Sequence, residues 1–229
     1  GAYGVTAEVD ARITADPMGD YVDTGGVGGT LAGTASDPGD NVGYRAAQIG
    51  IAALVEGIPA LAGVTLQTEQ VAQLDSKDMA FDVWVKLAQR VAHHLSLSEV
   101  QAVVITHGTD TLEETAYFLH ALLMPSKPVV LTCAMRPANF KDADGPQNLR
   151  DALLVASTPN RLGVCLVAAG EIHHSQYVQK VHPTRLNAFD SGETGLAGRV
   201  HNDQIQWLDT FNSPKTSDKF SVSQLLPAA

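Results

Sequence analysis

The sequence predicts an α/β protein with a doubly wound and mostly parallel sheet. Three runs, at 100–105, 128–134 and 162–169, are apolar throughout, which is typical of parallel strands covered by helices on both faces. Helical patterns at 111–124 and about 146–157 separate these runs, so strands and helices alternate. The βα units are too few for a barrel, and we expect an open, flavodoxin-like sheet.

The segment before the first apolar run adds two helices and a strand. Residues 44–57 predict a helix, which ends at Gly57 two residues before a proline. A short alternating strand begins at residues 64–66. Residues 79–95 predict the clearest amphipathic helix, because apolar residues recur every four positions. These apolar residues are Val83, Leu87, Val91 and Leu95.

The two ends of the chain depart from this alternation. Short strands at 196–200 and 205–208 flank a turn and predict a C-terminal β-hairpin. Residues 18–23 hold two carboxylates and a glycine, unlike a central parallel strand. We therefore expect three regions: an atypical N-terminal segment at 1–23, one domain at 24–211, and a linker-like tail rich in Ser, Pro and Lys at 212–229.

Composition is that of an ordinary soluble globular protein and argues against several partners. Lys and Arg total 15 against 25 for Asp and Glu, a net charge of −10. The chain has no Lys/Arg-rich run, so we expect neither nucleic acid nor an anionic membrane surface as a partner. No apolar run approaches the roughly 20 residues of a membrane span, and residues 1–20 do not read as a signal peptide.

Cysteine and histidine usage indicates no metal site. Cys133 and Cys165 each lie inside an apolar run, so we expect buried free thiols. The pairs His93-His94 and His173-His174 show no spacing typical of metal ligands. We expect these histidines to be solvated.

The most informative segment follows the apolar run at 100–105. It reads Thr-His-Gly-Thr-Asp-Thr at 106–111 and continues into a helix with Glu113 and Glu114 in its first turn, where the macrodipole favours acidic residues. Side chains just beyond the carboxyl end of a strand in an open α/β sheet lie where ligands bind. A helix cap at Asp110 or Thr111 would explain either residue singly. It does not explain a hydroxyl, a carboxylate and an imidazole together.

A second polar cluster lies at 24–33, where seven of ten residues are glycine or threonine, Thr30 among them. Glycines let a ligand approach the backbone closely. A dinucleotide site would need a third glycine at Leu31, and a P-loop is excluded because no Gly-Lys-Ser/Thr follows. A purely structural glycine turn remains an alternative to a hydroxyl nucleophile at Thr30.

Taken together, these motifs resemble the bacterial L-asparaginase family, including its glutaminase-asparaginases. The resemblance rests on Gly-Gly-Thr-Leu-Ala-Gly at 28–33 and on Thr-His-Gly-Thr-Asp-Thr-Leu-Glu-Glu-Thr-Ala-Tyr-Phe-Leu at 106–119. Shorter matches follow in the family's order around Ser76, at 134–137, at 143–149 and around Lys180. The resemblance covers roughly residues 24–226.

The resemblance implies hydrolysis of the side-chain amide of L-asparagine, with L-glutamine as a second candidate substrate, and without a cofactor. Thr30 would be the attacking hydroxyl, with Tyr44 on the loop that closes over substrate. Thr109, Asp110 and Lys180 would form a second hydroxyl–carboxylate–amine set that relays protons. Ammonia would leave, and water would then hydrolyse the acyl-threonine ester.

The resemblance also implies how the free amino acid is gripped. Asp110 would hold the α-ammonium and Ser76 the α-carboxylate. Lys77 stands where the family often has glutamine or glutamate, which bears on the choice between asparagine and glutamine.

Each of these residues also has a plain structural alternative. Lys180 taken alone would be a solvated surface lysine, Ser76 a helix N-cap, and Tyr44 a packing residue that opens the helix at 44–57. Asp144 and Asn148 look structural, as turn and helix-start residues.

The chain also departs from the family at two places. The stretched glycine segment admits a second register, with Val27 at the nucleophile position. The sequence also stops where the family continues into a smaller C-terminal α/β domain, which completes the neighbouring subunit's site with a carboxylate and an amide. It is therefore either a fragment or a naturally short relative with impaired catalysis. The competing function is therefore a non-catalytic amino-acid-binding or assembly module. A nucleotide-binding protein is a weaker third reading because the fingerprints are missing.

Assembly and location are implied by the resemblance alone. We expect a homo-oligomer, a tetramer built as a dimer of dimers, whose partner besides itself is a small-molecule substrate. The continuation Glu113-Glu114-Thr115 resembles the periplasmic or secreted branch, with the cytoplasm as the alternative.

Overall fold

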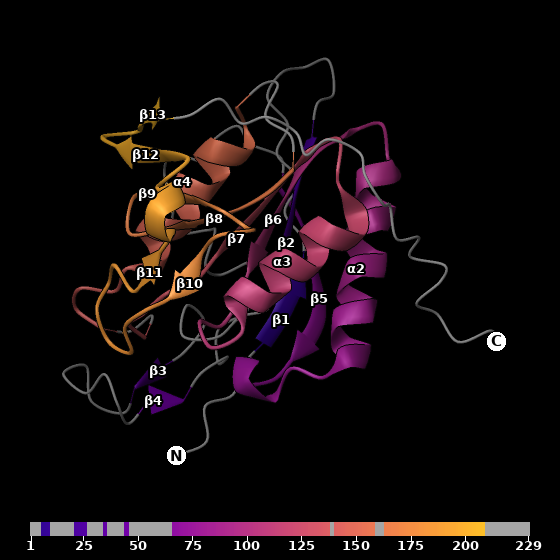
Figure 1. The fold of residues 1–229 in the computed structure, drawn as a ribbon. Coiled ribbons are helices and arrows are strands. Elements are labelled where there is room, and N and C mark those ends of the chain that lie inside the picture. Colours follow the sequence, from indigo (N-terminus) through magenta and orange to yellow (C-terminus); the bar gives the residue numbers. More distant parts are fainter. Residues whose placement is uncertain are drawn as a thin grey trace.

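A nine-stranded mixed sheet forms the centre of the structure, a computed structural model that describes residues 6–9, 21–26, 34–35, 44–45, 66–137, 140–158 and 163–208 (Figure 1). From one edge to the other, the strands are β1 (Thr6–Val9), β5 (Leu66–Gln73), β2 (Tyr21–Gly26), β6 (Val100–Thr106), β7 (Pro128–Thr132), β8 (Gly163–Ala168), β9 (Glu171–His174), β12 (Gly198–His201) and β13 (Gln204–Trp207).

Five neighbouring strands are parallel and have the flavodoxin order. Along the sheet they run β5-β2-β6-β7-β8, and every adjacent pair among them is parallel. Numbered by their sequence order, this is 2-1-3-4-5, so the predicted doubly wound sheet is confirmed. The order reverses between β2 and β6. In this class of sheet, ligands bind beyond the carboxyl ends of the two strands at such a reversal.

Helices cover both faces, which explains the uniformly apolar strands. Alternate residues of β6 point to opposite faces. Val103 and Ile105 pack with α2 (Phe81–Ser96) and α3 (Leu112–Leu123), whereas Ala102 and Val104 pack with α4 (Gly145–Ala156). All four of these β6 side chains are fully buried.

Two short strand pairs lie outside the main sheet. One joins β3 (Thr34–Ala35) to β4 (Tyr44–Arg45), and the other joins β10 (Gln179–Lys180) to β11 (Phe189–Asp190). Two single-turn 3₁₀ helices, η3 (Ser76–Asp78) and η4 (Gly192–Thr194), complete the described elements.

The predicted C-terminal hairpin is confirmed, with β12 and β13 paired around Asn202 and Asp203. Both turn residues have positive φ, 50° and 59°, which suits the tight turns that join antiparallel strands and which Asn and Asp tolerate.

Two expectations about the N-terminal part are wrong. Tyr44 and Arg45 form β4, so the helix expected from residue 44 does not begin there; residues 46–65 lie outside the described part. The polar approach to the glycine cluster is a central parallel strand, because β2 pairs with both β5 and β6. Pairing uses backbone N–H and C=O groups, which polar residues also carry. The expected domain boundary between residues 23 and 24 falls inside β2, while the tail at 212–229 lies outside the described residues.

The expectation that the histidine pairs are solvated is wrong for one member of each pair, whereas the cysteines are buried free thiols as expected. His94 is buried beside Glu69, with 2.9 Å from its Nε2 to the carboxylate Oε2, and His173 is buried with its Nδ1 2.9 Å from Ser191 Oγ. No local pattern around these histidines points to polar partners so far away in the chain. Cys133 and Cys165 are buried free thiols, and burial raises the pKa of Cys133.

Candidate active site

The motif at 106–111 lies at the carboxyl end of β6, beside the reversal between β2 and β6. The polypeptide leaves the sheet at Thr106 and enters α3 at Leu112. Thr111 holds the N-cap position, but its hydroxyl makes no cap bond and instead donates to Ser76 O at 2.7 Å. The capping interpretation is therefore right about the position of Thr111 at the N-cap, but it does not predict the hydrogen bond that its hydroxyl makes.

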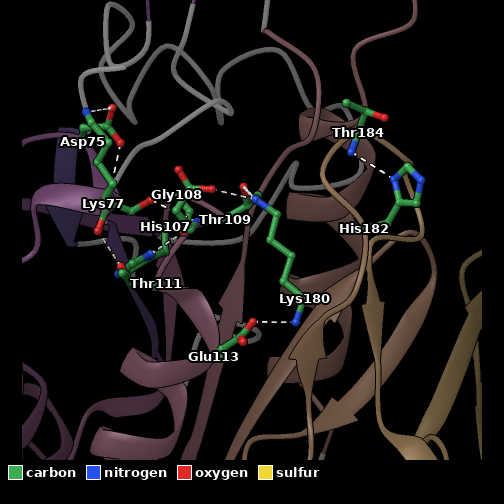
Figure 2. A network of polar contacts seen from close by, with 12 residues as sticks. Asp75, Lys77, His107, Gly108, Thr109, Thr111, Glu113, Lys180, His182 and Thr184 are labelled. Atoms are coloured by element: carbon green, nitrogen blue, oxygen red, sulfur yellow. Dashed lines mark hydrogen bonds and ion pairs between the residues drawn. The ribbon is translucent and has the colours of Figure 1, made fainter. Parts of the chain in front are cut away.

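Lys180 reaches this turn from β10, as Figure 2 shows. Its Nζ donates to Thr109 Oγ1 at 2.8 Å and to Asp110 Oδ1 at 2.7 Å. The lysine side chain is 19% exposed and that of Asp110 is 46% exposed, while Thr109 is buried. Lys180 is therefore not the solvated surface lysine that its residue type alone suggests, and the three predicted groups meet at one point.

Ser76 lies against the same turn. Its Oγ accepts the backbone N–H of Asp110 at 3.1 Å, across 34 residues of sequence. Ser76 is the first residue of η3, and the N-cap is Asp75, whose carboxylate accepts the N–H of Lys77 at 3.2 Å. The cap alternative for Ser76 is therefore wrong, and Asp75 is a buried residue that the sequence interpretation missed.

Lys77 brings a cation to the rim of the site. Its ammonium is ion-paired with Asp75 and, at 3.1 Å, with Asp78. The hydrogen bond that the Lys77 ammonium donates to Asp75 raises the pKa of Lys77, and the nearby Asp78 carboxylate adds to this. The Lys77 side chain is 42% exposed, so its charge remains accessible to solvent.

His107, the imidazole of the motif, turns into the core. It is fully buried, with Nδ1 2.7 Å from Gly108 O and Nε2 2.9 Å from Thr115 Oγ1. Burial lowers the pKa of His107 to about 4, so the ring is neutral at pH 7. The ring proton lies on Nδ1 because that nitrogen faces a carbonyl oxygen. The imidazole thus supports the backbone just before Thr109 and does not face the site.

The residues behind His107 link two helices to the turn. Thr115 Oγ1 also accepts the indole N–H of Trp84, on α2, at 2.7 Å. A spacing of eight residues within one motif gives no signal for the contact between His107 and Thr115. The partner on α2 lies a further 31 residues away from Thr115.

Glu113 is a second residue that the sequence interpretation missed in this role. It accepts the backbone N–H of Lys180 at 2.6 Å through Oε2. Burial raises the pKa of its carboxyl, and the Lys180 N–H acts against that rise. The only sequence signal was an acidic residue in the first turn of a helix, which the macrodipole explains equally well.

Asp144 and Asn148 are structural, as expected. The Asp144 carboxylate accepts the backbone N–H groups of Met135 and Arg136, each at 2.9 Å. Asn148 donates to Cys133 O at 3.0 Å and accepts the N–H of Ala169 at 2.9 Å. These bonds tie the turns after β7 and β8 to the start of α4.

Two predicted site residues are not placed with the others. Thr30 lies outside the described residues, and Tyr44 is described only by its backbone in β4. The choice between Thr30 and Val27 at the nucleophile position therefore stays a prediction. Within the described ranges, no group of three or more His, Cys, Asp or Glu side chains is placed to hold a metal ion, and no helix there is long and apolar enough to cross a membrane.

Comparison with known proteins identifies the family. The part of the asparaginase family described as "Asparaginase, N-terminal" matches residues 24–212. L-asparaginase 2 of Bacillus subtilis is 37% identical over 202 residues, which cover 86% of this chain and 54% of that protein. A probable periplasmic L-asparaginase of Haemophilus influenzae is also 37% identical over 202 residues, covering 86% and 57%.

A solved structure agrees with these relatives. The crystal structure of a probable cytoplasmic L-asparaginase from Campylobacter jejuni has a TM-score of 0.78 and 34% identity, covering 87% of this chain and 62% of that one. The chain spans about half the length of the curated relatives it matches, 54% and 57% for the two named above. The match over 24–212 includes the turn at 106–111 as well as Ser76 and Lys180, and by it this chain belongs to the asparaginase family.

Proposed function

We propose that this protein hydrolyses the side-chain amide of L-asparagine, and that of L-glutamine as a second substrate, to the acid and ammonia. The observation that carries the proposal is the Lys180 ammonium placed between Thr109 Oγ1 and Asp110 Oδ1, at 2.8 and 2.7 Å. A hydroxyl, an amine and a carboxylate in hydrogen-bond contact form a proton relay of the kind that amide hydrolysis requires.

The reaction proceeds through an acyl-enzyme. The hydroxyl of Thr30 attacks the side-chain carbonyl carbon, the C–N bond breaks, and the nitrogen leaves as ammonia with the proton of the attacking hydroxyl. Water then adds to the acyl-threonine ester and restores the hydroxyl. Thr109 and Lys180 pass protons between the attacking oxygen and the leaving group, while Asp110 keeps the lysine oriented.

The substrate backbone is held at the same turn. Asp110 is 46% exposed, so its carboxylate is accessible to a substrate ammonium. Ser76 Oγ accepts the N–H of Asp110, and its own O–H remains a donor for the α-carboxylate. Lys77 adds a positive charge beside that carboxylate position and bears on the preference between asparagine and glutamine.

Oligomeric state and location follow the family in the same way. We infer a homotetramer from the resemblance, which places a neighbouring subunit's C-terminal domain at each site. The exposed aromatic side chains of Phe81 and Tyr117, each 55% exposed, are apolar surface that an assembly would cover. Periplasmic and cytoplasmic relatives both match; we favour the periplasm on the continuation at 113–115.

The test measures ammonia released from L-asparagine and L-glutamine, together with binding of both by calorimetry. Wild-type protein is expected to release ammonia, and Lys180→Met is expected to lose at least about a hundredfold in kcat. Lys127→Met is the matched control. Lys127 is a half-buried lysine just before the amino end of β7, away from the turn after β6, and its Nζ donates to Leu97 O. Binding of asparagine without ammonia release would support the competing function, a non-catalytic amino-acid-binding module.

A further inference from the structure

Lys180 is carried by an element that the main sheet does not hold. β10 has two residues and pairs only with β11 among the described strands. A two-stranded pair of this length is not stable by itself. Something else must keep Lys180 at a fixed distance from the turn after β6.

The strand register shows which backbone group is available for that purpose. Lys180 lies opposite Phe189, and the next residue, Val181, donates its N–H to Ala188 O at 2.8 Å. Successive N–H groups along a strand point to opposite sides. The N–H of Lys180 therefore points away from β11, toward α3.

Glu113 supplies the acceptor on that side. Its Oε2 lies 2.6 Å from the backbone nitrogen of Lys180, across 67 residues of sequence (Figure 2). Glu113 is in the first turn of α3, where the helix macrodipole favours a carboxylate. A hydrogen bond to a charged acceptor is shorter and stronger than one between neutral groups.

We propose that Glu113 is a positioning residue for Lys180, holding its backbone while Thr109 and Asp110 hold its ammonium. Thr109, Asp110 and Glu113 belong to one five-residue stretch. The backbone and the ammonium of Lys180 are therefore both bonded to the same turn. The distance from that turn to the ammonium is then set by the length of one side chain. As a claim about turnover, this rests on the proposed function.

The electrostatic surroundings of Glu113 agree with a carboxylate that is engaged. Burial raises the pKa of its carboxyl and the neighbouring Glu114 raises it further, while the N–H and the charge of Lys180 lower it. Glu114 is exposed on the same helical turn. Substitution of Glu114 therefore serves as a control, because it removes the same charge and leaves the hydrogen bond between Glu113 and the Lys180 N–H intact.

The first test compares Glu113→Ala, Glu113→Gln and Glu114→Ala in steady-state kinetics with L-asparagine. Misplacing a reacting group by about 1 Å costs about a hundredfold in rate, so kcat of Glu113→Ala is expected to fall about 30- to 100-fold. KM should stay within about threefold, because Ser76 and Asp110 still bind the substrate. The amide oxygen of Glu113→Gln still accepts the N–H and should restore most of kcat, and Glu114→Ala should behave as wild type.

A second measurement does not depend on turnover. Hydrogen exchange of the Lys180 backbone amide, followed by NMR, is expected to accelerate about 10- to 100-fold in Glu113→Ala, as loss of a charge-assisted bond predicts. Exchange in Glu113→Gln should lie between wild type and Glu113→Ala, because a neutral acceptor makes a weaker bond than a carboxylate, and Glu114→Ala should not change it. The exchange measurement tests the contact between Glu113 and Lys180 even if wild-type protein releases no ammonia. Absence of ammonia release would refute the proposed function instead.

Two results would overturn the proposal. Unchanged exchange at Lys180 in Glu113→Ala would mean that the carboxylate does not hold this N–H. Faster exchange with unchanged kcat would mean that the contact is structural and has no part in placing the ammonium. Because Glu113→Gln keeps both the shape and the acceptor, recovery of most of kcat in this variant would show that the acceptor, and not the negative charge, places Lys180.

Discussion

Two polar clusters lie at the same carboxyl edge of the sheet, and they use similar residues in different ways. After β7 and β8, Asp144 and Asn148 bond mainly to backbone groups: two N–H groups on the carboxylate, and one carbonyl and one N–H on the amide. After β6, the Lys180 ammonium meets the side chains of Thr109 and Asp110.

This difference distinguishes polar residues that stabilise the fold from polar residues that are available for chemistry. A carboxylate whose oxygens accept backbone N–H groups closes a turn, and its bonding capacity is filled. Under the proposed function, polar side-chain heads that bond to one another, with Asp110 46% exposed, are able to exchange these partners for groups of the substrate. Residue type and position at a strand end are therefore not enough to identify a reactive group; its bonding partners are needed as well.

The largest expected effect is on the reactive cluster. Thr109→Val removes the hydroxyl that Lys180 bonds and keeps the side-chain shape, so kcat should fall about a thousandfold, or about 4 kcal/mol in barrier height. The thermal midpoint should change little. Thr158→Val, at the C-terminal end of α4, is the control, and equal losses in both variants would contradict the comparison.

A second prediction concerns the neutral imidazole that supports the reactive turn. Burial lowers the pKa of both His107 and His173 from 6.5 to about 4. Between these two pH values the unfolded chain binds protons that the folded chain does not, so stability rises with pH and is lost as pH falls. Each histidine contributes about 3 kcal/mol of this loss when pH drops from 7 to 4.

The measurement is the free energy of unfolding by urea at several pH values. His107→Gln should flatten the dependence between pH 4 and 6.5, whatever it does to stability at pH 7. Glu113 and Asp151, whose pKa values burial raises, act in the opposite direction and remain in both proteins, so the difference between the two slopes isolates His107. Parallel curves for wild type and variant would show that the ring is protonated in the folded protein.

A third prediction concerns the structural cluster. Asn148→Ala leaves Cys133 O and the N–H of Ala169 without this partner in a buried place, which should cost about 2 kcal/mol of unfolding free energy. Under conditions where the variant remains folded, kcat should stay within a few-fold of wild type. A kcat loss as large as that of Thr109→Val would remove the distinction between the two clusters.

The smallest expected effect is on a surface ion pair near the structural cluster. Arg150 bonds the carboxylate of Asp203, joining α4 to the turn between β12 and β13, and both side chains are partly exposed, by 32% and 53%. A double-mutant cycle with Arg150→Ala and Asp203→Ala should give a coupling of less than about 1 kcal/mol. A larger value would make the hairpin part of the rigid frame that Asn148 stabilises.

The parallel sheet was predictable because its signal is local. The runs that became β6, β7 and β8 are apolar through their whole length, since helices cover both faces. β2 carries no such signal, because its place between β5 and β6 comes from backbone pairing with strands elsewhere in the chain. Tyr44 and Arg45 were mistaken for a helix start for the same reason.

The site was predictable in part, and mostly through the long motif. Thr109 and Asp110 follow a strong strand and precede a strong helix, so their position at the sheet edge follows from the sequence. Lys180 lies in a strand of two residues, too short to show any periodicity, and only the resemblance pointed to it. Glu113 and Asp75 were missed because an acidic residue near a helix start has an ordinary explanation.

The separation of 71 positions between Thr109 and Lys180 also sets an order of events during synthesis. A ribosome adding about 5–20 residues per second makes the threonine roughly 4–14 s before the lysine. β6, which precedes Thr109, and its neighbouring parallel strands are complete by residue 168, so they are able to pair before β10 emerges. Under the proposed function, a nascent chain whose central strands have paired has no activity until β10 docks against α3 and brings Lys180 to Thr109.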